Sequence, residues 1–123
     1  MARIVFCEDD PNVRKLIRTV MGSTAHEVHL AADGREGLDL IEEVRPDMVF
    51  TDVSMPGLDG FRMYREILGR PHLAAIPVVF MTATAQRSEV ETAERMGAAG
   101  YVVKPFRAAE LRAKVDELAE GGG

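Results

Sequence analysis

The chain has 123 residues, of which 46% are hydrophobic and 28% are charged, and its formal net charge is −5. This length fits one domain with a core of its own. The negative charge and the short Lys/Arg runs argue against nucleic acid or an anionic membrane surface as the main partner. The sequence contains no N-terminal signal pattern and nothing near the ~18 apolar residues of a membrane span. A single cysteine, Cys7, excludes an intrachain disulfide and suits a reducing compartment, so we expect a cytoplasmic location.

Short apolar runs, rich in β-branched residues, predict five strands. Met48–Thr51 and Val78–Met81 are apolar without alternation, as expected of strands that are buried on both faces of a sheet. Glu27-Val28-His29-Leu30 alternates polar and apolar residues, which is typical of an edge strand. In chain order the predicted strands are Ile4–Cys7, Glu27–Ala31, Met48–Thr51, Val78–Met81 and Tyr101–Val103.

A helix is predicted after each of these runs, because apolar residues recur there at intervals of three and four residues. In chain order the apolar stripes are Val13, Leu16, Ile17 and Val20; Leu38, Ile41 and Val44; Phe61, Tyr64, Ile67 and Leu68; Val90, Ala93 and Gly97; and Leu111, Val115 and Leu118.

Local signals indicate where several of these helices begin and end. Asp10-Pro11 resembles an N-cap followed by proline at the first helical position. Asp33-x-x-Glu36 and Ser88-x-x-Glu91 have the form of a capping box. Gly22 and Gly97 stand where the first and fourth helices are expected to end.

Five strands that alternate with five helices predict an α/β domain, in which helices cover both faces of a parallel sheet. We expect this domain to span residues 1–120, with the glycines at 121–123 as a flexible tail. In such sheets ligands bind outside the carboxyl ends of the strands. Charged residues that directly follow the strands are therefore the candidate site residues.

Acidic residues follow two of the predicted strands at this edge. Glu8 and Asp9 come directly after the first strand, and Asp52 comes directly after the third. Two carboxylates about 5 Å apart repel by roughly 3 kcal/mol at an effective dielectric of about 20, so the cluster must hold protons or a cation. Oxygen ligands favour a hard divalent ion such as Mg²⁺. The backbone carbonyl of Ser54, just past the turn, is a candidate further ligand.

Lys104 follows the last predicted strand and supplies a cation at the same edge. An ammonium opposite a metal-bound carboxylate suits a phosphoryl oxygen, and the hydroxyl of Thr82 can donate to a second one. Phosphoryl transfer needs mainly positioning and charge stabilisation. We therefore interpret Asp52 as a nucleophile that forms an acyl phosphate.

Over nearly its whole length the chain resembles the receiver domains of bacterial two-component response regulators. Each shared motif alone is modest evidence, but four of them in order at the strand ends are specific. The motifs are Glu8-Asp9, Asp52-x-x-Met55-Pro56-x-x-Asp59-Gly60, Thr82-Ala83 and Gly100-Tyr101-x-x-Lys104-Pro105-Phe106. The resemblance implies a flavodoxin-like (βα)₅ fold, a three-layer sandwich whose parallel sheet has the strand order 2-1-3-4-5.

The resemblance also implies that Asp52 receives a phosphoryl group from a phosphohistidine on a sensor histidine kinase or a phosphotransfer protein. Mg²⁺ would be held by Asp9, Asp52 and the backbone oxygen of Ser54. Glu8, where many receivers have Asp, would act through metal-bound water. The protein would be a phospho-acceptor switch that assists its own phosphorylation and dephosphorylation, not an enzyme.

The switch itself follows the same resemblance. Thr82 would be drawn toward the added charge, and Tyr101 would then move inward behind it. This movement would alter the face formed by residues 86–119, to which a downstream effector protein or an output domain would bind. The protein would be a monomer or a phosphorylation-dependent dimer. The family further suggests a cis peptide bond before Pro105.

Two functions of other classes compete with this interpretation. A phosphohydrolase of the haloacid-dehalogenase type would also use Asp52 as nucleophile with Mg²⁺, but it needs a second acid where this chain has Ser54. A flavin- or nucleotide-binding module would need a glycine- or hydroxyl-rich loop after the first strand. This chain has Glu8-Asp9-Asp10-Pro11 there. The sequence leaves open whether the receiver acts alone or belongs to a larger regulator.

Overall fold

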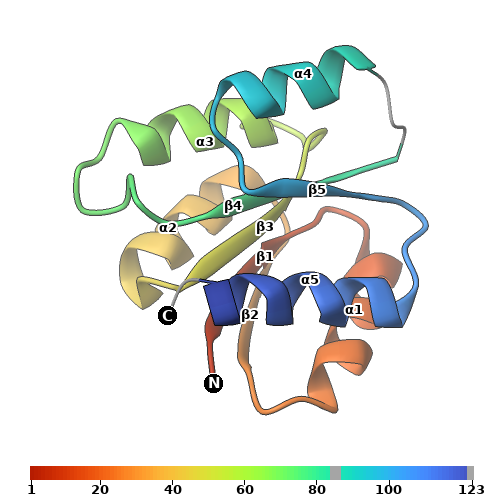
Figure 1. Ribbon diagram of the computed structural model, residues 1–123. Helices are drawn as coiled ribbons and strands as arrows, with labels where there is room; N and C mark the ends of the chain where they lie inside the picture. Colours follow the sequence, from red (N-terminus) through yellow and green to blue (C-terminus); the bar gives the residue numbers. More distant parts are fainter. Residues whose placement is uncertain (84–86, 122–123) are drawn as a thin grey trace.

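Strands and helices alternate throughout the computed structural model, which describes residues 1–83 and 87–121 (Figure 1). In chain order the elements are β1 (Arg3–Cys7), α1 (Pro11–Gly22), β2 (Glu27–Ala31), α2 (Gly34–Val44), β3 (Met48–Asp52), α3 (Gly60–Leu68), β4 (Val78–Thr82), α4 (Arg87–Arg95), β5 (Gly100–Val103) and α5 (Ala108–Gly121). All neighbouring strands pair in parallel, in the order β2-β1-β3-β4-β5. The predicted flavodoxin-like topology is therefore confirmed.

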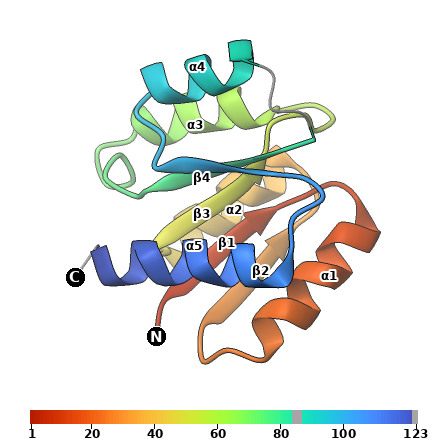
Figure 2. The ribbon, with the colours of Figure 1, turned by 45° about the vertical axis from the view of Figure 1, so that its right-hand side comes forward.

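Helices cover both faces of the sheet, so the domain has three layers. α1 and α5 pack on one face, whereas α2, α3 and α4 pack on the other (Figure 1 and Figure 2). Each interface has its own core: Ile17 and Val115 belong to the first, and Leu38 and Ile67 belong to the second. The apolar stripes predicted from the sequence supply both cores, since all four of these residues are fully or almost fully buried.

Burial along the strands follows their place in the sheet. β3 and β4 are buried at every position, as their continuous apolar sequences predict. β2 forms one edge and is buried only at Ala31, which confirms that Glu27–Ala31 is an edge strand. β5 forms the other edge, where Tyr101 and Val103 are exposed on either side of the buried Val102.

Most of the predicted helix boundaries are confirmed. Asp10 caps α1 by accepting a hydrogen bond from the backbone N–H of Asn12, and Asp33 caps α2 by accepting one from Glu36. The prediction that Ser88 caps a helix is wrong, because α4 already begins at Arg87. Ser88 lies inside the helix, where its carbonyl accepts a hydrogen bond from the hydroxyl of Thr92.

The start of α3 lies close against the end of β3. A Cβ atom on Gly60 would lie 2.1 Å from the carbonyl oxygen of Asp52, so no larger residue fits there without displacing that strand end. The N–H of Gly60 also donates to the carbonyl of Val53 at 2.9 Å. Asp59, directly before this contact, caps α3. Close packing thus holds the backbone that carries Asp52.

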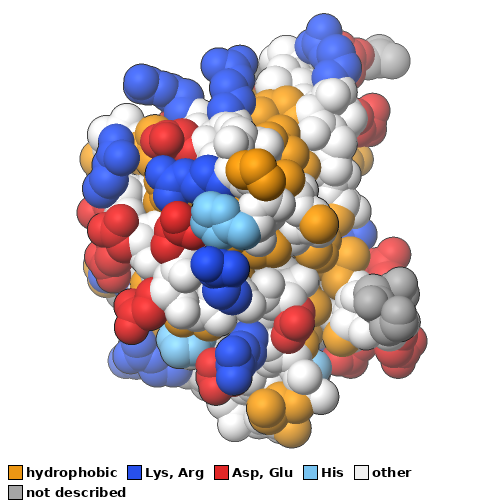
Figure 3. Space-filling model, turned by 90° about the vertical axis from the view of Figure 1, so that its left-hand side faces the viewer, with side chains coloured by type: hydrophobic (Ala, Val, Ile, Leu, Met, Phe, Trp, Pro, Cys, Tyr) orange, Lys and Arg blue, Asp and Glu red, His pale blue; other side chains and the backbone are white. Residues whose placement is uncertain are grey.

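Charged side chains of both signs are mixed on the face shown in Figure 3. Ion pairs also join α2, α3 and the segment after α3. Arg70 pairs with Glu42 at 3.1 Å and with Glu66 at 3.6 Å, and Arg35 pairs with Glu66 at 3.8 Å. Arg35 and Arg70 are therefore each paired with at least one carboxylate. No helix among residues 1–83 and 87–121 combines the length and the apolar character needed to cross a membrane.

Candidate functional site

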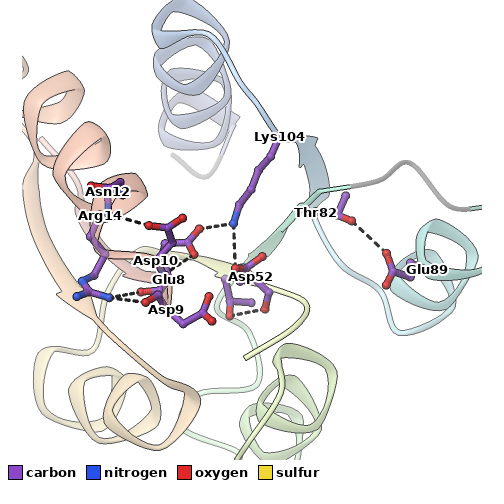
Figure 4. A network of polar contacts seen from close by, with 10 residues as sticks. Glu8, Asp9, Asp10, Asn12, Arg14, Asp52, Thr82, Glu89 and Lys104 are labelled. Carbon is purple, nitrogen blue, oxygen red and sulfur yellow. Dashed lines mark hydrogen bonds and ion pairs between the residues drawn. The ribbon is translucent and has the colours of Figure 1, made fainter. Parts of the chain in front are cut away.

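The carboxyl ends of four strands bring the predicted site residues together (Figure 4). Asp52 is the last residue of β3 and Thr82 the last of β4, while Glu8 directly follows β1 and Lys104 directly follows β5. In the sheet register Cys7 lies beside Thr51, and Asp52 lies beside Met81. Because parallel strands end at the same edge, residues far apart in the chain become neighbours there.

Three carboxylates form the centre of the site. One oxygen from each of Glu8, Asp9 and Asp52 lies within 4.8 Å of the others. Glu8 is fully buried and Asp52 is 7% exposed, whereas Asp9 is open to solvent. At the 4.8 Å limit, each ionised pair repels by about 3 kcal/mol at an effective dielectric of about 20. The expected acidic cluster is therefore present, and it needs a compensating positive charge.

Lys104 supplies part of that compensation. Its Nζ donates to Oδ2 of Asp52 at 2.9 Å and forms an ion pair with Oε1 of Glu8. Burial disfavours the charged ammonium, but the hydrogen bonds to Glu8 and Asp52 outweigh this effect and raise the pKa of Lys104. Lys104 thus links the ends of β1, β3 and β5 as a charged group.

The surroundings of Asp52 change the pKa of its carboxyl group. Burial raises its pKa to about 7. The hydrogen bond from Lys104 opposes this rise, and the neighbouring Glu8 adds to it. The protein therefore holds a carboxylate at a place where its charge is costly until a further cation is present.

Backbone groups and one arginine hold the loop between β1 and α1. The N–H of Asp10 donates to Oε2 of Glu8 at 3.0 Å. Nη1 of Arg14 donates to the carbonyl oxygens of Glu8 at 2.9 Å and of Asp9 at 3.0 Å. Arg14 is not among the residues predicted from the sequence, although a basic residue in the first turn after an acidic pair is a signal that could have indicated this role.

The two expected switch residues have different surroundings. Thr82 is 4% exposed, and its hydroxyl donates to Oε2 of Glu89 in α4 at 3.1 Å. Tyr101 is 41% exposed and lies on β5. Glu89 was not predicted from the sequence either, because it has no distinctive spacing from the other site residues. Residues 84–86, between Thr82 and α4, lie outside the described part of the chain.

An open depression of about 510 Å³ lies next to the acidic cluster. The residues that line it include Asp9, Ser54, Pro56, Phe61 and Glu89. Ser54, two residues after the end of β3, is exposed and lines this opening. Solvent and a small anion can reach the cluster from this side.

The donor set fits a hard divalent cation. All three clustered side chains offer carboxylate oxygens, and the exposed Asp9 gives the cluster access to solvent. Such oxygen ligands suit Mg²⁺, which binds through one or two carboxylates and keeps several of its waters. With Lys104 charged, three ionised carboxylates would still leave the cluster negative.

Comparisons with known proteins agree with this geometry. Residues 4–116 match the family model for the response regulator receiver domain. Response regulator MprA of Mycolicibacterium vanbaalenii is 40% identical over 116 residues, which cover 94% of this chain and 49% of that protein. Chemotaxis protein CheY4 of Vibrio cholerae superposes with a TM-score of 0.90 and 26% identity, covering 96% of this chain and 98% of that one.

A further solved structure contains a bound metal ion. The receiver domain of sensor histidine kinase PA1611 from Pseudomonas aeruginosa PAO1 has magnesium coordinated in its active site cleft. It superposes with a TM-score of 0.86 and 30% identity, covering 95% of this chain and 96% of that one. Several curated relatives are longer, and the chain spans between 23% and 53% of their length.

Proposed function

This chain belongs to the response regulator receiver domain family, and on that basis we propose that Asp52 is its phosphoryl acceptor. The donor is a phosphohistidine on a sensor histidine kinase or a phosphotransfer protein. An oxygen of Asp52 attacks phosphorus, the phosphorus–nitrogen bond breaks, and the imidazole leaves with the bonding electrons. The observation that carries the proposal is the convergence of Asp52, Lys104 and two further carboxylates beside one open depression.

The chain's own groups prepare this transfer. Lys104 holds Oδ2 of Asp52, which leaves the other carboxylate oxygen for the attack. The ammonium then lies where it can compensate the charge on a phosphoryl oxygen. The attack needs the ionised form of Asp52, and Lys104 favours that form against the effect of burial.

We assign Mg²⁺ to the carboxylate cluster, with Asp9, Asp52 and the Ser54 backbone oxygen as direct ligands. Oε1 of Glu8 forms an ion pair with Lys104, and Oε2 accepts a hydrogen bond from the N–H of Asp10. This arrangement favours a role for Glu8 through metal-bound water. When bound, Mg²⁺ supplies charge that stabilises the transferring phosphoryl oxygens and relieves the repulsion among the carboxylates.

Phosphorylation of Asp52 is signalled to a partner through a surface of the domain. We propose that Thr82 moves toward the phosphoryl group, Tyr101 moves inward, and the face of residues 86–119 changes, residue 86 itself lying outside the described residues. Tyr101 is 41% exposed on that face, so it has room to move. A downstream effector protein or an output domain binds the altered face. Longer relatives such as MprA support an output domain, and phosphorylation-dependent dimerisation would use the same face.

A phospho-acceptor switch explains the site better than a hydrolase does. A phosphohydrolase of the haloacid-dehalogenase type needs a second acid two residues after its nucleophile, and Ser54 occupies that position. The family match does not support that alternative either. We therefore propose that turnover at Asp52 is limited to the assisted formation and loss of its own acyl phosphate.

Labelling with radioactive acetyl phosphate tests the acceptor. We expect label that depends on Mg²⁺ and is absent from the Asp52→Asn variant. The matched control is Asp59→Asn, because Asp59 borders the same depression and Asn also caps a helix well. The control should be labelled like the parent protein. Undiminished labelling of Asp52→Asn would refute the assignment of Asp52.

A further inference from the structure

The hydroxyl of Thr82 is held by a carboxylate on a neighbouring helix. Oγ1 of Thr82 donates to Oε2 of Glu89 at 3.1 Å, and this contact links the end of β4 to the first turn of α4. Figure 4 shows the hydroxyl pointing toward Glu89 and away from Asp52. Thr82 is 4% exposed and Glu89 is half-buried, so water competes little for the hydroxyl.

A threonine hydroxyl has one hydrogen to donate. It cannot donate that hydrogen to Glu89 and to a phosphoryl oxygen on Asp52 at the same time. The move of Thr82 that the proposed function requires must therefore break the contact with Glu89. We propose that Glu89 is a positioning residue that keeps the Thr82 hydroxyl off the acceptor until a phosphoryl group competes for it. This inference rests on the proposed role of Asp52.

The place and charge of Glu89 support this role. Glu89 lines the same depression as Asp9, a member of the acidic cluster. A phosphoryl group brings roughly −1.5 to −2 charges to the site. That charge repels the carboxylate of Glu89 and attracts the Thr82 hydroxyl, so both effects favour release of the contact. Because Glu89 belongs to α4, the release also acts on an element of the 86–119 face.

The size of the effect follows from the contact that must break. A hydrogen bond to a charged acceptor changes an equilibrium by about tenfold or more. Only molecules in which the Thr82 hydroxyl has left Glu89 can bind a phosphoryl mimic fully. The apparent affinity for the mimic is therefore lower when fewer molecules are in that state. Removing the carboxylate of Glu89 should therefore raise that affinity by about tenfold. The same change removes a contact of the unphosphorylated protein, which should become less stable.

Beryllofluoride, a phosphoryl mimic that binds acceptor carboxylates, provides the probe. We expect Glu89→Ala to bind beryllofluoride about tenfold more tightly than the parent protein, as followed by NMR titration at fixed Mg²⁺. The same variant should unfold at a lower urea concentration without beryllofluoride. Glu89→Gln keeps an oxygen that can accept the hydrogen bond but loses the negative charge, so its affinity should rise by clearly less than that of Glu89→Ala. Glu94→Ala removes an exposed carboxylate from the same helix and should change neither value.

A double-variant cycle isolates the contact. In a Thr82→Val background, Glu89→Ala should no longer change beryllofluoride affinity. Equal effects of Glu89→Ala and Glu89→Gln would mean that charge alone acts, and they would overturn the proposal. So would an unchanged or weaker affinity of Glu89→Ala. If Asp52 is not the acceptor, beryllofluoride binding would survive Asp52→Asn, so failure of the proposed function is a separate result.

Discussion

We predict that Asp52→Asn stabilises the metal-free protein at pH 8. In the folded protein burial raises the pKa of Asp52 to about 7, against an ordinary value of 3.8. At a pH between these two pKa values, Asp52 is already ionised in the unfolded chain but still protonated in the folded protein. Stability therefore falls as pH rises, by about 1.4 kcal/mol per pH unit, and the loss is complete above about pH 7.

The difference between the pKa of about 7 in the folded protein and the ordinary pKa of 3.8 sets an upper limit of about 4 kcal/mol for this loss of stability. Asp52→Asn removes the titrating group but also the ionic attraction to Lys104, so part of the gain is cancelled. We expect a net stabilisation of about 1–3 kcal/mol at pH 8, with a smaller difference at pH 5.

Urea unfolding in EDTA at pH 5, 6, 7 and 8 measures the effect. The difference between parent and variant isolates Asp52, because the other titrating groups are common to both proteins. Asp9→Asn is the matched control: Asp9 belongs to the same cluster but is exposed, so its neutralisation should not reproduce the pH dependence. Parallel stability profiles for the parent and Asp52→Asn between pH 5 and 8 would refute this reasoning.

Three further predictions use other features of the molecule. In Mg²⁺ titrations, Asp9→Asn should lower affinity by tenfold or more, since it removes a proposed ligand, whereas Asp10→Asn should not, because Asn is an equally good N-cap. Gly60→Ala should lower the unfolding free energy by more than about 2 kcal/mol in urea, because the new Cβ would lie 2.1 Å from the carbonyl oxygen of Asp52. Burial raises the pKa of the Cys7 thiol to about 12, so a thiol reagent at pH 8 should label Cys7 only after unfolding, and rapid labelling of the folded protein would contradict this.

The strand ends could be predicted from the sequence, and with them the site's main groups. Continuous apolar runs identified β3 and β4 as central strands, and the parallel topology then placed Asp52, Glu8 and Lys104 at the same edge of the sheet. The burial of Glu8 and the exposure of Asp9 did not follow from their adjacent positions. They depend on the direction of the chain as it leaves β1, which tertiary contacts decide.

Contacts between helices and strand ends could not be predicted from the sequence, because they also depend on tertiary packing. Arg14 meets the carbonyls of Glu8 and Asp9 because α1 folds back over the end of β1, and Glu89 meets Thr82 because of where α4 packs. The failed prediction of a cap at Ser88 shows the limit of local signals. Its spacing from Glu91 has the correct form, but the pattern alone does not determine where a helix begins.

The electrostatics of the site make chemistry and stability depend on the same cation. With Asp52 near a pKa of 7, a substantial share of the metal-free molecules carries a protonated acceptor at neutral pH, and a protonated carboxyl is a poor nucleophile. A divalent cation on the cluster would favour the ionised form, and it would offset the repulsion between Asp52 and Glu8 that Lys104 alone does not remove. Cation binding should therefore increase both the fraction of reactive acceptor and the free energy of unfolding. By linkage, lowering the pH should weaken cation binding, because protons and cation compete for the same carboxylates.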